Sequence, residues 1–536
     1  MRVTDGHGVA MLAAVRSAAL LGIEAFAVTV EVHVAPGLPQ LSLVGLAASA
    51  VKESRERVVA ALATIGLPVP PRRITISLSP GDVRKEGTAF DLPIALGLLA
   101  AVGTVPAETL EALVLVGELA LDGTLRPVRG ALPVAHWAAR SGYRLVLPPA
   151  NLAEAARVAR LAVSAPPTLA VLVEQLRSGP LPDAVRPALP ARAGGADDLA
   201  DVVGQRAAKR ALEVAAAGAH NLLMIGPPGA GKTMLARRLP SILPALADEE
   251  ATEVLSIRSV AGLPPALDAR PERPFRAPHH TISVAGLVGG GTPLRPGEVT
   301  LAHHGVLLLD EIAEMPRHAL DTLRQPLEDG VVTLSRAQAT ITFPARFSLV
   351  AAMNPCPCGR AGEPEHACTC APADVDRYQA RLSGPLADRI DLHLRVAAVP
   401  PRALAAHAAS GATAEEPSLA VRARVETARA RQRARYAQLP GITTNARAPA
   451  RWLEQHGRIS GEARELLVTA AERLALSARA FHRVLRVART VADLEAARDV
   501  GEPHVAEALR WRPTPARPAG AVLPLAPPTP AGVPHH

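Results

Sequence analysis

Cysteine and aromatic residues are scarce in this 536-residue chain. Phenylalanine, tryptophan and tyrosine together make up 2% of the residues, so the hydrophobic cores must be built from alanine, leucine and valine. If the chain binds nucleic acid, so few aromatic rings mean that stacking on bases can contribute only modestly to that binding. The chain has four cysteines, and all of them fall between Cys356 and Cys370, in "NPCPCGRAGEPEHACTC". This grouping indicates a shared local role.

The sequence also lacks a recognisable leader and a membrane span. Met1 is followed by "RVTDGHGVAML", which has no apolar core and no cleavage site. No stretch of 18 uncharged apolar residues occurs, so we expect no membrane partner. These absences predict a cytoplasmic protein. In that compartment clustered cysteines favour metal ligation over disulfides.

Positively charged residues are in modest excess over negatively charged ones. The chain has 58 Lys and Arg against 50 Asp and Glu, a formal net charge of +8. The excess is mostly arginine, which suits binding to a polyanion such as nucleic acid but does not establish it.

A chain of this length predicts about three domains. The first segment alternates short apolar strands, such as "AFAVTVEVHV" and "RRITISLSP", with Ala/Leu-rich helices, which is typical of an α/β or α+β domain. "DDLADVVGQRAAKRALEVAAAG" predicts a helix with acidic residues at its start. The segments that we predict are an α/β domain over 1–178, a linker over 179–196, a motif-bearing domain over 197–399, a helical domain over 400–512 and a disordered Pro-rich tail over 513–536.

The stretch "NLLMIGPPGAGKTMLARRL" carries the strongest motif. It fits G-x-x-x-x-G-K-[ST] between an apolar strand over 221–225 and a helix. In this context glycines let backbone N–H groups close around phosphates, Lys232 reaches the β- and γ-phosphates, and Thr233 binds Mg²⁺. The predicted nucleotide-binding residues are Gly226, Pro227, Pro228, Gly229, Ala230, Gly231, Lys232, Thr233 and Met234.

Two further apolar runs end in polar residues. "GVLLLDEI" predicts a buried parallel strand over 306–309 that delivers Asp310 to Mg²⁺ and Glu311 to the attacking water. "FSLVAAM" ends at Asn354, whose amide can position that water against the γ-phosphate. Together the three motifs resemble the Walker A, Walker B and sensor 1 elements of AAA+ ATPases, which implies ATP and Mg²⁺ as ligands.

In AAA+ proteins the site lies between subunits, so the resemblance implies one arginine that acts across the boundary and a further arginine at the sensor 2 position. Arg389, in "SGPLADRIDLHLRV", matches the arginine-finger position. In "FHRVLRVARTVADLE", Arg486 is the candidate for sensor 2, and Arg483, one turn away, is its alternative. Any single arginine here can equally belong to a solvated helix face.

Two insertions narrow the resemblance to the magnesium-chelatase-like branch of AAA+ proteins. "RPFRAPHHTISVAGLVGGGTPLRPGEVTLAHHG" resembles a helix-2 insert, and "LEDGVVTLSRAQATITFPARF" predicts a β-hairpin with strands over 331–334 and 340–343. In hexameric relatives such elements point into the central pore, so Arg336, Arg276 and His279 are candidate pore contacts. The histidine pairs at 279–280 and 303–304 lack the i,i+4 spacing of metal-binding helices, which disfavours a metal there.

The first segment resembles the proteolytic domain of Lon proteases through "PGDVRKEGTAFDLPIALGLLAA" and "VGELALDGTLRPVRGALPVAHWAARSGYRLVLPP". Ala89 stands at the place of the nucleophilic serine and Leu132 at the place of the activating lysine, so protease chemistry is absent. This order of segments resembles the ComM/YifB family over residues 1–512. The resemblance implies a homo-hexameric ATP-driven motor that migrates DNA branches when transforming DNA is integrated. We expect it to bind single-stranded and branched DNA without sequence preference.

The cysteines form two C-x-C pairs, Cys356 with Cys358 and Cys368 with Cys370. Two such pairs can converge on one tetrahedral Zn²⁺, with His366 as a spare ligand. The polar stretch between them cannot pack a core alone, so a metal would hold it. Reduced thiols and a disulfide remain the alternatives.

Three other functions compete with the DNA motor. A chelatase subunit that powers metal insertion into a porphyrin shares the ATPase motifs, but its close relatives lack the Lon-like domain. An ATP-dependent protease is disfavoured by Ala89 and Leu132. A non-enzymatic scaffold is disfavoured by the intact set of Lys232, Asp310 and Glu311.

Overall fold

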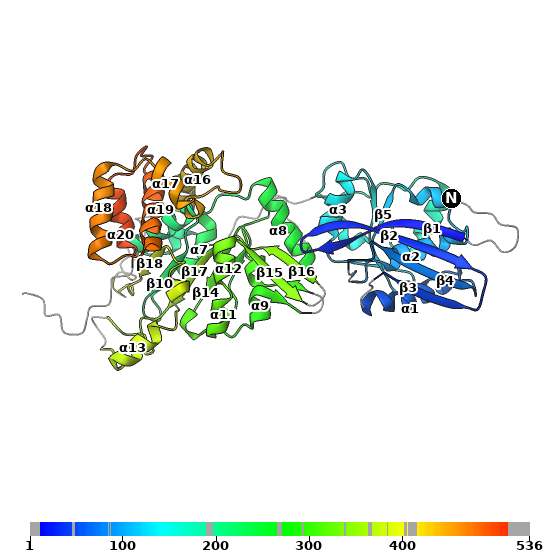
Figure 1. Ribbon diagram of the computed structural model, residues 1–536, viewed down its shortest axis with the longest axis horizontal. Coiled ribbons are helices and arrows are strands. Elements are labelled where there is room, and N and C mark those ends of the chain that lie inside the picture. The colour runs from blue at the N-terminus through cyan, green and yellow to red at the C-terminus, as the bar shows by residue number, and fades with distance from the viewer. Residues whose placement is uncertain are drawn as a thin grey trace, which may run out of the picture.

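The structure is a computed structural model in which two α/β regions lie side by side, with a group of helices stacked on the second (Figure 1). Among the residues that it describes, no helix is both long enough and apolar enough to span a membrane. The described residues are 11–45, 49–83, 85, 87–188, 197–264, 271–291, 294–336, 339–362, 367–382, 384–400, 402, 405 and 415–512.

The N-terminal region is built on a seven-stranded mixed sheet of order β3-β4-β2-β1-β5-β8-β9. Alternate valines of β2 are buried, and they pack with helix α2, which is buried along almost its whole length. The elements are β1 Met11–Leu21, β2 Glu24–Ala35, β3 Gln40–Val44, α1 Ser49–Thr64, β4 Arg73–Ser79, α2 Asp91–Ala101, β5 Leu113–Leu115, β6 Glu118–Leu119, β7 Leu125–Arg126, α3 Ala131–Arg140, β8 Arg144–Val146, α4 Leu152–Ala155, β9 Val163–Ser164 and α5 Leu169–Ser178.

The second region contains a five-stranded sheet of order β11-β14-β17-β10-β18, in which every pairing is parallel. Its carboxyl ends share one edge, where ligands of such sheets bind. The elements are α6 Arg206–Gly218, β10 Leu222–Ile225, α7 Lys232–Ile242, α8 Asp248–Ala261, β11 Phe275–Arg276, α9 Val284–Val288, β12 Gly289–Gly290, β13 Arg295–Pro296, α10 Glu298–Leu301, β14 Val306–Leu309, α11 Arg317–Asp321, α12 Arg324–Asp329, β15 Val331–Arg336, β16 Ala339–Pro344, β17 Ser348–Met353, α13 Pro372–Gln379, α14 Gly384–Ala387 and β18 Leu392–Arg395.

The predicted hairpin is confirmed as β15 and β16, which are longer than expected and pair from Val331↔Pro344 to Arg336↔Ala339. The prediction that a helix begins at the acidic residues 197–198 is wrong. Asp198 instead caps a short 3-10 turn, and α6 begins only at Arg206. Gly204 and Gln205 separate the two because both have positive φ, which an α-helix cannot accommodate.

The C-terminal helices are α16 Ser418–Arg435, α17 Ala450–His456, α18 Gly461–Arg473, α19 Ala478–Leu494 and α20 Glu502–Arg510. They share one hydrophobic core with α6, α7 and one face of the parallel sheet. The predicted tail over 513–536 and residues 189–196 of the predicted linker lie outside the described residues. The fold is therefore mixed α/β, with a parallel-sheet core and C-terminal helices.

Helix α8 joins the N-terminal region to the parallel-sheet region. Its Ser259 accepts the Gly130 N–H on its carbonyl oxygen at 3.0 Å and the Leu132 N–H on Oγ at 3.3 Å. Ser259 Oγ also donates to Glu154. These contacts connect the start of α3 to the parallel-sheet region.

Candidate functional site

The glycine-rich loop lies between β10 and α7, at the carboxyl edge of the parallel sheet. Gly229 and Gly231 have φ of 77° and 84°, which favour glycine. A Cβ atom at Gly226 would lie 2.2 Å from the Val396 carbonyl oxygen, so this position admits no side chain. The loop leads into α7 at Lys232, and the free N–H groups of a helix start favour phosphate there.

Lys232 and Asn354 come together as predicted from their motifs. Lys232 Nζ donates to Asn354 Oδ1 at 3.1 Å and to the carbonyl oxygens of Gly226 and Pro227 at 2.7 and 2.9 Å. Burial lowers the pKa of Lys232, against the opposing charges of Asp310 and Glu311. The ammonium group is thus surrounded by oxygen acceptors, as a phosphate-binding lysine requires.

Thr233 and Asp310 also meet. Thr233 Oγ1 donates to Asp310 Oδ2 at 2.6 Å, at the start of α7 and the end of β14. A hydroxyl and a carboxylate oxygen facing each other are a donor set that Mg²⁺ accepts, so these residues fit that ion. Met234, the last residue of the predicted nucleotide set, is 46% exposed.

Glu311 has left-handed backbone geometry, with φ 50° and ψ 43°. Its N–H donates to Asp310 Oδ1 at 3.0 Å, and its side chain is 54% exposed. A non-glycine residue in this region is uncommon and costs about 1 kcal/mol or more. Such strain clusters at functional sites, which agrees with the predicted role of this carboxylate.

Arg389, the predicted trans arginine, lies at the opposite, amino edge of the sheet. Asn221, just before β10, donates from Nδ2 to the Arg389 carbonyl oxygen at 2.8 Å, whereas the glycine-rich loop follows β10. Four strand residues span about 13 Å. Arg389 therefore does not share an edge with the glycine-rich loop of its own chain. Its guanidinium pairs with Glu328 and donates to the Pro385 carbonyl oxygen at 2.7 Å.

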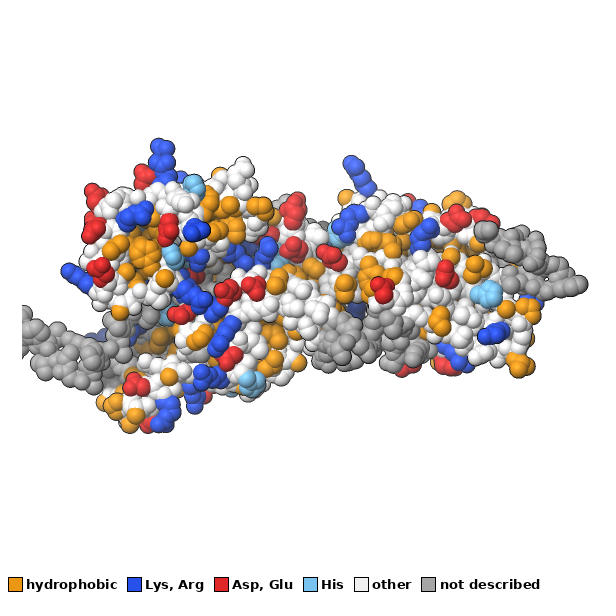
Figure 2. All heavy atoms as spheres, viewed as in Figure 1, with side chains coloured by type: hydrophobic (Ala, Val, Ile, Leu, Met, Phe, Trp, Pro, Cys, Tyr) orange, Lys and Arg blue, Asp and Glu red, His pale blue; other side chains and the backbone are white. Residues whose placement is uncertain are grey.

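Arg483 and Arg486 lie beside Arg389 in one cavity of about 750 Å³. Figure 2 shows basic side chains gathered in the hollow between the C-terminal helices and α12. Arg486 Nε donates to the Ala448 carbonyl oxygen at 3.0 Å, and Arg483 Nε lies 3.5 Å from Asp391 Oδ1. The arginines that line this cavity are Arg273, Arg346, Arg389, Arg429, Arg447, Arg479, Arg483 and Arg486.

Part of this positive charge is not neutralised. Arg483 Nη1 is buried without a hydrogen-bond partner in the described part of the chain. Burial, reinforced by neighbouring Arg346, lowers the pKa of Arg447 to about 10. No acid is among the groups that shift the pKa of Arg447, although Glu250 and Glu328 pair with other arginines of the cavity. The cavity is therefore suited to an anion.

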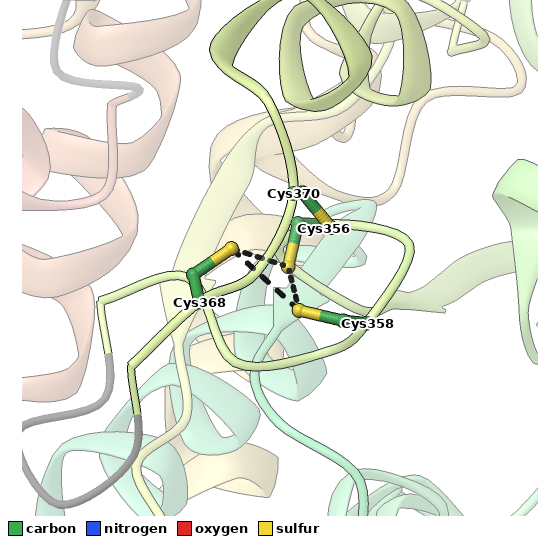
Figure 3. Close-up of side chains that lie close together, drawn as sticks. All are labelled: Cys356, Cys358, Cys368 and Cys370. Atoms are coloured by element: carbon green, nitrogen blue, oxygen red, sulfur yellow. Dashed lines mark hydrogen bonds between the residues drawn. The ribbon is translucent and has the colours of Figure 1, made fainter.

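The four cysteines converge as predicted (Figure 3). Cys356 Sγ lies 3.3 Å from Cys358 Sγ and 3.6 Å from Cys368 Sγ, and all four sulfurs lie within 4.8 Å of one another. A tetrahedral Zn²⁺ with bonds of about 2.3 Å places its sulfurs about 3.8 Å apart. All four thiols are free, so the set fits zinc. The spare candidate His366 lies outside the described residues.

The cysteine loop packs directly on the glycine-rich loop. A Cβ atom at Gly359 would lie 2.6 Å from Pro228 Cδ, and Gly359 has φ of 81°. Backbone N–H groups of Arg360 and Thr369 lower the pKa of Cys358 to about 5, which favours its thiolate. Holding the cysteines together therefore also positions their loop next to the glycine-rich loop.

Comparison with known proteins assigns a family. The family model "Magnesium chelatase, subunit ChlI" matches residues 198–404, "Subunit ChlI of Mg-chelatase" matches 30–151, and the ChlI C-terminal model matches 415–512. The chain is 44% identical to "Uncharacterized protein YifB" of Salmonella typhimurium over 504 residues, 94% of this chain and 97% of the relative. It is 42% identical to "Competence protein ComM" of Haemophilus influenzae over 506 residues, with the same coverage. The chain belongs to the ComM/YifB family of magnesium-chelatase-like proteins.

The similarity to a magnesium-chelatase subunit itself covers only part of the chain. The "Magnesium-chelatase 38 kDa subunit" of Cereibacter sphaeroides is 27% identical over 183 residues, which is 29% of this ComM/YifB-family chain and 51% of that subunit.

In this ComM/YifB-family chain apolar residues occupy the two positions that correspond to the serine and lysine of a Lon protease. Ala89 precedes α2 and packs against the hydrophobic cluster that contains Leu132, at the start of α3. Leu132 is 2% exposed. No nucleophile or base stands at either position.

The paired histidines have partners that sequence reasoning did not identify. Glu253 Oε2 lies 2.7 Å from His303 Nε2 and 2.8 Å from His304 Nε2. His303 Nδ1 accepts the Arg346 N–H at 2.9 Å, so Nε2 is the nitrogen that carries hydrogen and donates to Glu253. The neutral His303 is therefore a hydrogen-bond donor to Glu253, and this opposes a metal at His303 Nε2. Arg276, a candidate pore contact, is bound to an acid of its own chain: its Nε and Nη2 donate to the two carboxylate oxygens of Glu298 at 2.6 and 2.7 Å.

Proposed function

We propose that this chain is an ATPase subunit of a homo-hexameric ring that moves branched DNA during homologous recombination of incoming DNA. The observation that supports it best is the convergence of Lys232, Thr233, Asp310 and Asn354 at one edge of the sheet. In this proposal Lys232 neutralises the transferred phosphoryl group, and Asn354 and Glu311 orient and deprotonate the attacking water. Mg²⁺, held through Thr233 and Asp310, would offset the charge on the phosphate oxygens.

The two candidate halves of the site lie on opposite edges of the sheet, and this supports assembly into a ring. Each chain offers a phosphate site at the carboxyl edge of its sheet and an arginine-lined cavity at the amino edge. Head-to-tail contact joins the two edges of neighbouring subunits, and such contacts close into rings. Arg389 and either Arg483 or Arg486 then reach the nucleotide of the adjacent subunit. Of the latter two, Arg483 has the buried unpartnered Nη1, which favours it as the second arginine.

DNA is the substrate class that we propose for the motor. The support is the relative named "Competence protein ComM" together with the net charge of +8. Phosphate contacts of arginine and lysine are independent of base sequence and weaken as salt rises. We therefore propose binding of single-stranded and branched DNA through the hairpin β15–β16. Arg336 ends β15, and its side chain lies outside the described part of the structure.

Turnover of ATP should rise when single-stranded or branched DNA is added, and a labelled three- or four-way junction should move only when ATP is hydrolysed. Affinity for DNA should fall steeply between 50 and 200 mM salt, on the order of 10³-fold if about six phosphates are contacted. Arg336→Ala should slow junction movement more than DNA-free ATP turnover. Lys232→Ala serves as the inactive control. An assembled, ATP-hydrolysing ring that neither responds to DNA nor moves a junction at low salt would contradict the motor.

The second candidate is a chelatase-type ATPase that remodels a protein partner for metal insertion. The three matching family models favour it. The 38 kDa chelatase subunit covers only 29% of this chain, which favours the DNA motor. Protease and passive-scaffold functions are disfavoured by the apolar pair Ala89 and Leu132 and by the assembled ATPase residues.

We also propose a Lon-like fold without protease chemistry for 1–178, with an ATPase domain over 197–399 and a helical lid over 400–512. The sheet β3-β4-β2-β1-β5-β8-β9 and the apolar pair Ala89 and Leu132 support the first of these.

Zinc is proposed as a structural ion of the cysteine loop. Protein purified without added metal should contain about one zinc per chain, because four thiolates complete a tetrahedral site. Cys368→Ser should remove the ion and weaken ATP binding, since Gly359 packs on Pro228. The exposed neighbour Pro357→Ala is the matched control. Metal-free protein with four freely titrating thiols would refute the zinc site.

A further inference from the structure

Helix α8 lies at the border between the two α/β regions and contacts functional surfaces of both (Figure 1). Glu250 and Glu253, in its first half, line the arginine cavity. Leu255 packs against a hydrophobic cluster of the N-terminal region, and Ser259, in the last turn, bonds to that region. From Glu250 to Ser259 the helix advances about 14 Å. The N-terminal region is therefore connected to the cavity by a short helix.

Ser259 caps helix α3 of the N-terminal region. Gly130, which precedes α3, has left-handed geometry and has no side chain that could cap the helix. Ser259 supplies the acceptors instead: its carbonyl oxygen takes the Gly130 N–H at 3.0 Å, and its Oγ takes the Leu132 N–H at 3.3 Å. The same hydroxyl donates to Glu154. Because an unsatisfied N–H group is costly at a buried helix start, these bonds fix Ser259 on the N-terminal region.

Apolar contacts support the same attachment. Leu255 of α8 packs on the hydrophobic cluster that contains Leu132, and Ala89 packs on this cluster too. Ala89 and Leu132 stand at the positions that correspond to the serine and lysine of a Lon protease. A hydroxyl and an ammonium group would be costly to bury among these apolar side chains. The apolar residues at both positions therefore suit this surface to packing α8.

Further close approaches hold the N-terminal region against the parallel-sheet region. The turn between β1 and β2 lies on strand β16, since a Cβ atom at Gly22 would lie 3.0 Å from the Thr342 carbonyl oxygen and 3.6 Å from Ile341 Cγ2. At the end of α8, a Cβ atom at Gly262 would lie 2.8 Å from Arg129 Nε. Contacts at separate points define the orientation of the N-terminal region, so its position also determines the position of α8.

The first half of α8 holds the wall of the arginine cavity. Glu253 Oε2 accepts from His303 Nε2 at 2.7 Å, and His303 Nδ1 accepts the Arg346 N–H at 2.9 Å. Glu250 Oε2 accepts from Arg273 Nη2 at 2.8 Å. Arg346 and Arg273 both line the cavity. A shift of α8 therefore displaces cationic groups of the cavity that the proposed mechanism presents to the neighbouring subunit.

We propose that the N-terminal region positions the arginine cavity for ATP hydrolysis in the neighbouring subunit, with Ser259 and Glu154 as positioning residues that act through α8. The inference rests on the proposed ATPase function. Catalysis by a guanidinium depends on placement to within about 1 Å, so loosening this attachment lowers the rate of hydrolysis. The phosphate loop of the same chain lies at the opposite edge of the sheet and keeps its affinity for ATP.

Steady-state ATP turnover of the assembled full chain tests the attachment. Ser259→Ala and Glu154→Ala should each lower kcat about tenfold with KM for ATP unchanged. The double variant should be little slower than either single variant, because both changes remove the same hydrogen bond. Glu154→Gln keeps an acceptor oxygen for the Ser259 hydroxyl and should retain most of the wild-type kcat. Thr252→Ala is the matched control, because the Thr252 hydroxyl bonds within α8, to the Asp248 carbonyl oxygen at 2.9 Å.

Mixed rings show whether the defect lies in the cavity. A Glu154→Ala subunit keeps an intact phosphate loop, and a Lys232→Ala subunit keeps an intact cavity. In an equal mixture half of the intact phosphate loops face an intact cavity, so turnover should rise about two- to threefold above that of Glu154→Ala alone. A defect in the fold or in the phosphate loop of the same chain gives no such rise.

The outcomes separate the two proposals. If the wild-type assembly hydrolyses ATP and both alanine variants keep the wild-type kcat, the positioning role is wrong and the ATPase proposal stands. A lower kcat without recovery in confirmed mixed rings also overturns the positioning role, because the attachment then serves the fold of its own chain. A wild-type assembly without ATP turnover contradicts the ATPase proposal and this inference with it.

Discussion

Glu311→Gln is expected to lower the turnover number for ATP by about 10²–10⁴-fold while ATP binding is retained. The amide keeps the shape of the side chain but cannot accept the proton of the attacking water. The backbone contact of the Glu311 N–H with Asp310 is unaffected by the change, so the fold of the site should persist. ATP binding and single-turnover hydrolysis measured on the same preparation give both quantities.

Two further variants separate the loss of catalysis from the loss of ATP binding and from nonspecific effects. Lys232→Ala should lose ATP binding itself, because Lys232 contacts the loop that encloses the phosphates. Glu314→Gln changes an acid of the adjacent turn that pairs with Arg381 at the surface, and it should leave turnover near the wild-type value. Wild-type turnover in the Glu311 variant would remove this residue from the proposed mechanism.

Arg389→Ala is expected to lower turnover by about 10³–10⁵-fold, the range for arginines that stabilise phosphoryl transfer. The loss of structure should be small, because the guanidinium pairs mainly with Glu328, which is 57% exposed. The distinguishing experiment mixes Arg389→Ala subunits with Lys232→Ala subunits. Some interfaces of a mixed ring then combine an intact phosphate loop with an intact arginine, and turnover should partly return.

Arg377→Ala is the matched control for the mixing experiment, since Arg377 forms an exposed ion pair with Asp374. Mixed assembly has to be confirmed independently, for example with subunits that carry different labels. Confirmed mixed rings without any recovery, at every mixing ratio, would argue against Arg389 acting across the interface.

Local patterns predicted the parts of the site that lie at strand ends. The runs before Gly226, Asp310 and Asn354 are short strands that are apolar apart from Ser348 at the start of the third, and parallel strands place their ends together. The cysteine cluster was likewise visible as two pairs within 15 residues. In both cases the signal is contiguous in sequence, so no knowledge of tertiary packing was needed.

Features that depend on strand order were not predictable in this way. The meeting of His280 with Glu311 requires β11 to pair with β14, and the gathering of Arg389 with Arg483 requires a long connection to return to the amino edge. Strand β1 was also missed as a strand. Its sequence, "MLAAVRSAALL", is rich in good helix formers, and its pairing with β2 along the whole strand overrides that preference.

The glycine-rich loop and the arginine-lined cavity lie on opposite edges of one sheet. ATP turnover should therefore depend on the concentration of subunits. A lone subunit carries both halves of the proposed site yet cannot apply them to one nucleotide. Specific activity then follows mass action, rising as subunits associate and fading on dilution without any change within the subunit. A DNA strand that gathers subunits along its length raises their local concentration, and it would thereby confine ATP consumption to the places where DNA is present.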